Sequence, residues 1–150
     1  MDMLTGVYSI TLDEKGRLNF PAKLRTVLQQ NELYVTQGPD HCLMLFTTEE
    51  WTKLAEKIIG SASLFNTRQN LVLREFIQPA QKLEFDKSGR LSIPQGLRDY
   101  ASLLCGAECL LRGSIKYLEL WDAASYRAYC DKNEAQYLEA AEESMGNILL

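Results

Sequence analysis

Residues 13–25 of the chain are DEKGRLNFPAKLR, and residues 86–98 are DKSGRLSIPQGLR. Seven of the thirteen aligned positions are identical. The similarity continues downstream, for example at Leu45 and Leu120, once a length difference of two residues is allowed. The repeated unit is therefore a whole module, and the chain carries it twice.

The length and composition are those of an ordinary globular protein. The chain has 150 residues, of which 46% are hydrophobic and 24% are charged, so it is long enough to bury a sizeable core. Each repeated module has only about 45 to 50 residues, a size that is marginally stable alone. We therefore expect the modules to share a core, either with each other or with other subunits.

The cysteines and the N-terminal segment favour a reducing compartment. The cysteines form no CxxC pair, and His41 is the one histidine, so the sequence offers too few well-spaced ligands for a zinc site. We expect no metal, no cofactor, and buried free thiols at Cys42, Cys105, Cys109 and Cys130. No basic start precedes an apolar stretch, and no run approaches the roughly 18 apolar residues of a membrane span. The prediction is a cytoplasmic protein without membrane contact.

The charge of the chain is unevenly distributed. The formal net charge is −4, which by itself disfavours a nucleic-acid partner. Each thirteen-residue motif nevertheless carries a net charge of +2, so the rest of the chain totals −8. Residues 131–143 contain five acidic residues and one lysine, which we interpret as a solvated helix face. The motifs are thus local basic sites in an acidic protein.

The first motif predicts a tight turn between two strands. Upstream, apolar Tyr8, Ile10 and Leu12 alternate with polar residues, which is typical of a half-buried strand, and a second short strand is expected at 17–20. In the connecting segment 13–16, the Asp side chain can bond the backbone ahead of it and Gly can adopt positive φ. These residues predict the tip of a β-hairpin.

The remaining elements are predicted in the same order in both modules. The first module should continue with a helix from Pro21 to about residue 31, strands at 33–37 and 42–46, and a helix from 49 to about 59 that Thr47 and Glu50 cap. The second should contain a strand ending at Phe85, a turn at 86–89, a strand at 90–93, a helix from Pro94 to about 103, strands at 108–112 and 117–121, and a helix from 123 to about 141 that Asp122 caps. A linker helix or helix pair is expected at 63–77.

Two interpretations of the Asp and Arg in each motif remain open. The spacing of four residues recurs at Asp13 and Arg17 and at Asp86 and Arg90. A carboxylate and a guanidinium at this spacing around a turn can form a charge-assisted pair that only stabilises the turn. Alternatively, a planar guanidinium with five donors, at an exposed tip near a lysine, suits phosphate oxygens or a guanine edge. The local role is favoured for the aspartates and the binding role for the arginines.

Other motif residues are assigned by similar reasoning. Candidates for additional phosphate contacts are Lys15, Lys87, Lys23 and Arg25. Solvated helix positions explain Lys23 and Arg25 equally well. Residues expected to set backbone geometry only are Gly16, Gly89, Pro21 and Pro94. Two such turns per chain, multiplied by oligomerisation, would raise avidity for repeated DNA by about 10² to 10⁴.

Catalysis finds little support in the sequence. No seryl or cysteinyl nucleophile motif accompanies His41, and the glycines form no phosphate-binding array. Asp13 and Asp86 are poor candidates for an acid/base pair, because each has a basic partner that keeps it ionised. We therefore expect neither an enzyme nor a small-molecule substrate.

Three stretches resemble the MraZ family of bacterial transcription regulators. They are LDEKGRLNFPAKLR, FDKSGRLSIPQGLR and GSIKYLELWD, and the resemblance covers nearly all of residues 6–126. It implies an α+β fold of two tandem AbrB-like (SpoVT/AbrB-type) swapped-hairpin modules, β-rich with short helices and a linker helix. On this basis we assign module 1 to residues 7–53, the helical linker to 54–79, module 2 to 80–125, and an acidic helix and tail to 126–150.

The resemblance also implies a function. A ring-like homo-oligomer of this family would bind double-stranded DNA at short tandem promoter repeats of a division and cell-wall gene cluster, in the cytoplasm and associated with the nucleoid. The family motif falls on Asp13 and Arg17, and again on Asp86 and Arg90. The competing hypothesis is an oligomeric scaffold or protein-interaction ring whose basic tips bind acidic partners.

Overall fold

Short strands and short helices follow one another in the same order in both modules. The structure is a computed structural model that describes residues 3–61, 63 and 65–149. The strands are β1 (Val7–Thr11), β2 (Arg17–Asn19), β3 (Glu32–Gln37), β4 (Leu43–Phe46), β5 (Gln81–Glu84), β6 (Arg90–Ser92), β7 (Glu108–Gly113) and β8 (Leu118–Asp122). The helices are α1 (Ala22–Leu28), α2 (Thr48–Ser61), α3 (Thr67–Val72), α4 (Gln95–Tyr100) and α5 (Ala123–Leu149), with a 3-10 turn η1 (Pro39–His41) and a π-helical turn η2 (Leu73–Ile77). Residues 62 and 64 of the expected linker and residue 150 of the expected tail lie outside the described residues.

The strands of the two modules are interleaved in one sheet. Within the described residues, six strands form an antiparallel sheet in the order β1-β7-β8-β4-β3-β5. At each edge, the first strand of one module pairs with the third strand of the other, β1 with β7 and β5 with β3. In the centre, β4 pairs with β8. If each strand is replaced by its equivalent in the other module, the result is the same strand order read from the opposite edge of the sheet. The sheet therefore has an internal pseudo-twofold axis.

The second strands of the two motifs form a separate two-stranded ribbon. β2 and β6 pair antiparallel, with Leu18 opposite Leu91. Both leucine side chains are fully buried in the core, whereas their neighbours along each strand face outward, which is the period-two pattern of a half-buried ribbon. Hydrogen bonds from Phe20 N–H to the Gly89 carbonyl (3.2 Å) and from Ile93 N–H to the Gly16 carbonyl (2.9 Å) extend the ribbon at both ends.

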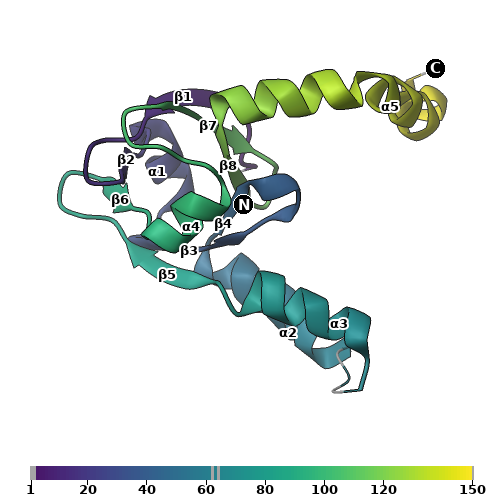
Figure 1. The fold of residues 1–150 in the computed structure, drawn as a ribbon, viewed down its shortest axis with the longest axis horizontal. Coiled ribbons are helices and arrows are strands. Elements are labelled where there is room, and N and C mark those ends of the chain that lie inside the picture. The colour runs from purple at the N-terminus through teal and green to yellow at the C-terminus, as the bar shows by residue number, and fades with distance from the viewer. Residues whose placement is uncertain (1–2, 62, 64, 150) are drawn as a thin grey trace.

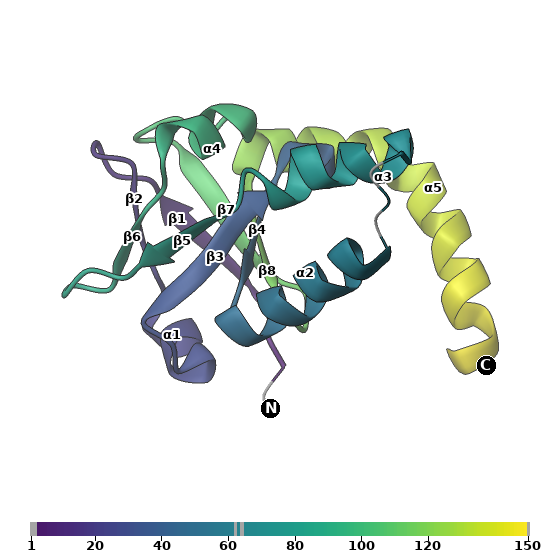
Figure 2. The same ribbon diagram turned by 90° about the horizontal axis from the view of Figure 1, so that it is seen from below.

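A single hydrophobic core holds the modules together. It contains buried leucines from the β2–β6 ribbon, from the six-stranded sheet and from α1 and α4, with members in both modules. This confirms the expectation that modules of this size share a core. In Figure 2, α1 and α4 lie on opposite sides of the strands, as the pseudo-twofold axis requires.

Three expectations from the sequence need correction. β1 and β2 flank a tight turn but do not form a hairpin together, because each pairs with a strand of the other module. The terminal helix continues to residue 149 instead of ending near 141, although Ser144, Gly146 and Asn147 are weak helix formers. Cys105 and Cys130 are exposed, and only Cys42 and Cys109 are buried as expected.

The ribbon and the long helices lie at opposite ends of the molecule. Both views place the turns before β2 and β6 at one end, with α5 and the α2–α3 pair at the other (Figures 1 and 2). The Asp122 side chain caps α5 by accepting hydrogen bonds from Ser125 N–H and Oγ, both 2.9 Å. In the part of the chain that the structure describes, no helix is both long and apolar enough to cross a membrane.

Candidate nucleic-acid interface

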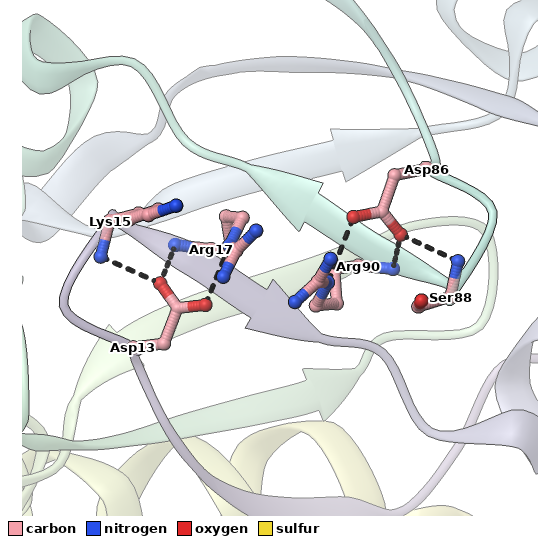
Figure 3. Close-up of polar contacts among 6 residues, drawn as sticks. All are labelled: Asp13, Lys15, Arg17, Asp86, Ser88 and Arg90. Carbon is pink, nitrogen blue, oxygen red and sulfur yellow. Dashed lines mark hydrogen bonds and ion pairs between the residues drawn. The ribbon is translucent and has the colours of Figure 1, made fainter.

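In each motif, the aspartate organises its turn through three hydrogen bonds. In the first turn, residues 13–17, Asp13 Oδ1 accepts from the backbone N–H groups of Lys15 (2.9 Å) and Arg17 (2.8 Å), and Oδ2 accepts from Arg17 Nε (2.7 Å). In the second turn, residues 86–90, the same bonds run to Ser88 N–H (2.9 Å), Arg90 N–H (2.9 Å) and Arg90 Nε (2.8 Å). The two sites are therefore near-identical in geometry (Figure 3).

These bonds keep the carboxylates ionised. The backbone N–H of Arg17 is the main cause that lowers the pKa of Asp13 below its ordinary 3.8, and the arginine side chain adds to it. The backbone N–H of Arg90 does the same for the pKa of Asp86. A carboxylate that stays charged at neutral pH holds its arginine in one orientation.

Each ion pair occupies only one of the three guanidinium nitrogens. Within the described residues, each aspartate takes Nε, and the terminal nitrogens Nη1 and Nη2 of Arg17 and Arg90 have no partner. The Arg17 side chain is 24% exposed and the Arg90 side chain 35% exposed. Stabilisation of the turn and binding of a ligand are thus compatible in one geometry, because Nε bonds the aspartate and the terminal nitrogens remain without a partner among the described residues.

The strand register brings the two arginines onto one surface. Arg17 lies opposite Ser92, and Asn19 lies opposite Arg90, so all four side chains share the outward face of the β2–β6 ribbon. Arg17 and Arg90 are diagonal neighbours, a relation that separates Cα atoms by roughly 7–8 Å. Figure 3 shows the arginines side by side between the two aspartates, whose negative charges reduce the repulsion between the guanidinium groups. The major groove of B-DNA is wide enough to admit a two-stranded β-ribbon.

Each turn also contacts an arginine from the other module. Gly16 and Gly89 both have φ of +77°, a conformation that glycine adopts without strain. The guanidinium of Arg98, in α4, lies over Gly16, and that of Arg25, in α1, lies over Gly89. A Cβ on Gly89 would be 2.5 Å from Arg25 Cζ, so the end of the Arg25 side chain would have to shift to admit one.

The remaining site candidates differ in accessibility. Lys15 and Lys87 are exposed in the turns, and Lys23 is exposed on α1. Arg25 is only partly accessible, because its guanidinium packs on Gly89. Pro21 and Pro94 immediately precede α1 and α4, as expected for residues that begin a helix.

Comparisons with known proteins agree with this architecture. A family model described as "MraZ protein, putative antitoxin-like" matches residues 3–75 and again residues 76–148, so each matched half contains one turn. The chain belongs to the MraZ family. A protein named Transcriptional regulator MraZ from Treponema denticola is 45% identical over 145 residues, which are 97% of this chain and 99% of that protein.

More distant MraZ proteins match over the same length. A Treponema pallidum protein with the same name is 42% identical over 146 residues, covering 97% of this chain and 96% of the relative. One from Halothermothrix orenii is 38% identical over 146 residues, covering 96% of this chain and 99% of the relative. The role in these names, transcriptional regulation, is not an enzymatic one.

Charge is segregated along the MraZ fold of this chain. The exposed lysines of the two turns accompany the arginines at the ribbon end, whereas α5, which contains the acidic segment 131–143, extends away from that end (Figures 1 and 2). The net charge of −4 therefore does not describe the ribbon. Among the residues that the structure describes, no group of three or more His, Cys, Asp or Glu side chains could hold a metal ion.

The buried thiols are unsuited to chemistry. Burial raises the pKa of Cys42 to about 12 and that of Cys109 to about 11, so both stay protonated at neutral pH. They pack as small apolar side chains, which is the role predicted for them from the sequence.

Sequence reasoning missed three residues of this surface. Arg98 closes the repeated motif at the position that aligns with Arg25, so the alignment itself carried that signal. Asn19 and Ser92 alternate with buried leucines, so the period-two pattern indicated that they face the same way as Arg17 and Arg90. The pattern did not indicate that β2 and β6 pair, which brings these two side chains together with the two arginines.

Proposed function

We propose that this chain is a sequence-specific DNA-binding transcription regulator. Its MraZ relatives are named transcriptional regulators. One observation carries the proposal. Two arginines, each oriented by its own aspartate and each with free terminal donors, lie on one exposed face of a ribbon that fits a major groove. Arginine is the side chain that most often recognises guanine, through O6 and N7. The site acts in the cytoplasm, at the nucleoid.

The DNA target in this proposal is a set of short tandem repeats in the promoter of a division and cell-wall gene cluster. The ribbon exposes two near-identical turns, which suits a target that repeats. Arg17 and Arg90 read base edges, while Lys15, Lys87 and Lys23 contact phosphates. Arg25 is a weaker candidate for phosphate contact, because its guanidinium packs on Gly89.

A ring-like homo-oligomer presents several ribbons to these repeats. The apolar surface supports self-association: of the twelve large hydrophobic residues that are exposed in the described part of the chain, eight lie on the helical end, namely Ile59, Phe65, Leu71, Val72, Tyr137, Leu138, Met145 and Ile148. Four of these belong to the α2–α3 region and four to α5, so different patches of neighbouring copies can meet. A head-to-tail contact between unlike patches closes into a ring when its rotation allows. Exposed apolar patches of this kind mark interaction sites.

The test is a fluorescence anisotropy titration with a duplex that contains the promoter repeats. Arg17→Ala removes a base contact and is expected to weaken binding by about 5- to 150-fold, the range for one good bidentate contact. Arg127→Ala is the matched control, since this exposed arginine lies on α5, in an element away from the ribbon. Loss of binding in both variants, or in neither, would contradict the proposal. Native mass measurement of the free chain checks the oligomer separately.

A further inference from the structure

The outward face of the β2–β6 ribbon carries two uncharged polar side chains, each opposite one of its arginines. Asn19 and Ser92 are both exposed, on either side of the buried pair Leu18 and Leu91. Asn19 lies opposite Arg90, and Ser92 lies opposite Arg17. A DNA groove that contains the two arginines therefore also contacts the Asn19 amide and the Ser92 hydroxyl.

These two side chains have no hydrogen-bonding role within the described fold. Within the described part of the chain, neither Asn19 nor Ser92 makes a side-chain hydrogen bond, in contrast to the aspartates and arginines of the turns. An Asn amide presents a donor and an acceptor side by side, which matches N6 and N7 of adenine. A Ser hydroxyl is short and can donate or accept, so it accommodates several bases.

The pseudo-twofold axis makes the difference between them informative. Arg17 and Arg90 are equivalent across the axis, with the same aspartate geometry, and so are Asn19 and Ser92 by position. The two arginines are therefore expected to prefer the same base in both halves of the site. The residue beside each arginine differs, with an amide next to Arg90 and a hydroxyl next to Arg17.

We propose that Asn19 and Ser92 are specificity-determining residues that make the two halves of the ribbon prefer different base pairs. The inference rests on the proposed function and deepens it. The half with Asn19 next to Arg90 selects an adenine near the guanine that Arg90 contacts. The half with Ser92 next to Arg17 tolerates several bases at the corresponding position. Within the tandem-repeat target, the site that one ribbon contacts is consequently an imperfect inverted repeat.

The test exchanges the two side chains and measures base preference. A panel of duplexes with every base pair of the bound repeat substituted singly is titrated with the full-length wild type, Asn19→Ser and Ser92→Asn. Asn19→Ser is expected to reduce discrimination by about 5- to 150-fold at one base-pair position, and Ser92→Asn to add a new adenine preference at the corresponding position in the other half. Because no charge changes, the slope of log affinity against log salt stays the same.

Several results separate this inference from the proposed function. If wild type discriminates among the duplexes and Arg17→Ala weakens binding as expected, but Asn19→Ser leaves the ranking of duplexes unchanged, the specificity role is refuted while the regulator proposal stands. A uniform loss of affinity across the panel also refutes it. If wild type binds no duplex, both proposals fail. Urea unfolding of the two variants, whose changed side chains are exposed, verifies that each is folded.

Discussion

The two modules of this chain share their turns but differ in the helices that follow their last strands. In module 1, α2 is followed by α3 and η2, and Trp51 of α2 packs against Phe76 of η2 with ring centroids 5.5 Å apart. In module 2, the corresponding α5 is one helix of 27 residues, and its Tyr126 packs under the Arg112 guanidinium at 4.1 Å. The ribbon end is thus duplicated and the helical end has diverged. The ribbon surface depends on the similarity of the two modules, and the surface of the helical end depends on the difference between them.

The largest expected effect tests whether the modules form one structure. Leu18 and Leu91 face each other with no exposed surface, so Leu18→Ala and Leu91→Ala are each expected to lower the free energy of unfolding by about 2–5 kcal/mol. Urea unfolding should show a single transition, shifted by similar amounts in both variants. Two separate transitions, of which each variant shifts only one, would mean that the modules fold independently.

The next prediction separates the two reasons for glycine in the turns. Gly106→Ala adds a side chain at φ of +86° in open space and should cost about 1–2 kcal/mol for the left-handed backbone alone. Gly89→Ala has a similar φ of +77° and in addition places Cβ 2.5 Å from Arg25 Cζ, which should add about 1–3 kcal/mol. Equal unfolding free energies for the two variants would show that Arg25 gives way without cost.

A smaller effect distinguishes the two arginines that cover the glycines. Arg98 Nε donates to the Ile93 carbonyl at 2.9 Å, whereas Arg25 Nε is buried without a partner among the described residues. Arg98→Met should therefore cost about 1.5–3 kcal/mol of unfolding free energy, as for a hydrogen bond from a charged group. Arg25→Met keeps the packing and removes the unpaired donor, so it should cost less than about 1 kcal/mol. The reverse order in thermal or urea unfolding would contradict the different anchoring.

The smallest effect is the pH dependence of the turns. The pKa of both Asp13 and Asp86 is lowered from 3.8, so the stabilisation by these carboxylates is present above that pH and is lost as pH falls through the lowered values. Carbon-detected NMR titration should place both carboxyl groups below 3.8. Arg17→Ala should raise the pKa of Asp13 only in part, because the backbone N–H at residue 17 remains, and should leave Asp86 unchanged. Titration of wild-type Asp13 at or above 3.8 would refute this account of the turns.

Much of the local structure was predictable from the sequence. The alternation at Tyr8, Ile10 and Leu12, the Asp and Gly of each turn and the proline before each short helix are local signals, and they predicted the elements nearly in full. The pairing of β1 with β7 and of β3 with β5 was not predictable, because alternation indicates which face of a strand is buried and not which strand lies beside it. The same limit hid the contact of Arg98 with Gly16.

Two errors arose from average residue preferences. Cysteine is among the most buried residue types, yet Cys105 lies in a loop and Cys130 on the exposed part of α5. The position of each residue in the fold, and not its type, determines its exposure. The end of α5 was expected near residue 141, but the helix continues to residue 149 through Ser144, Gly146 and Asn147, whose average helix propensities are low.

The most direct test of the central claim is the position of the β2–β6 ribbon in a cryo-EM structure of the full-length protein bound to a duplex with the promoter repeats. The account predicts that Arg17 and Arg90 of one chain enter the same major groove, with their terminal nitrogens at base edges and each Nε still bound to its aspartate. A complex in which α1, α4 or α5 fills the groove, or in which only one of the two arginines reaches the DNA, would contradict it.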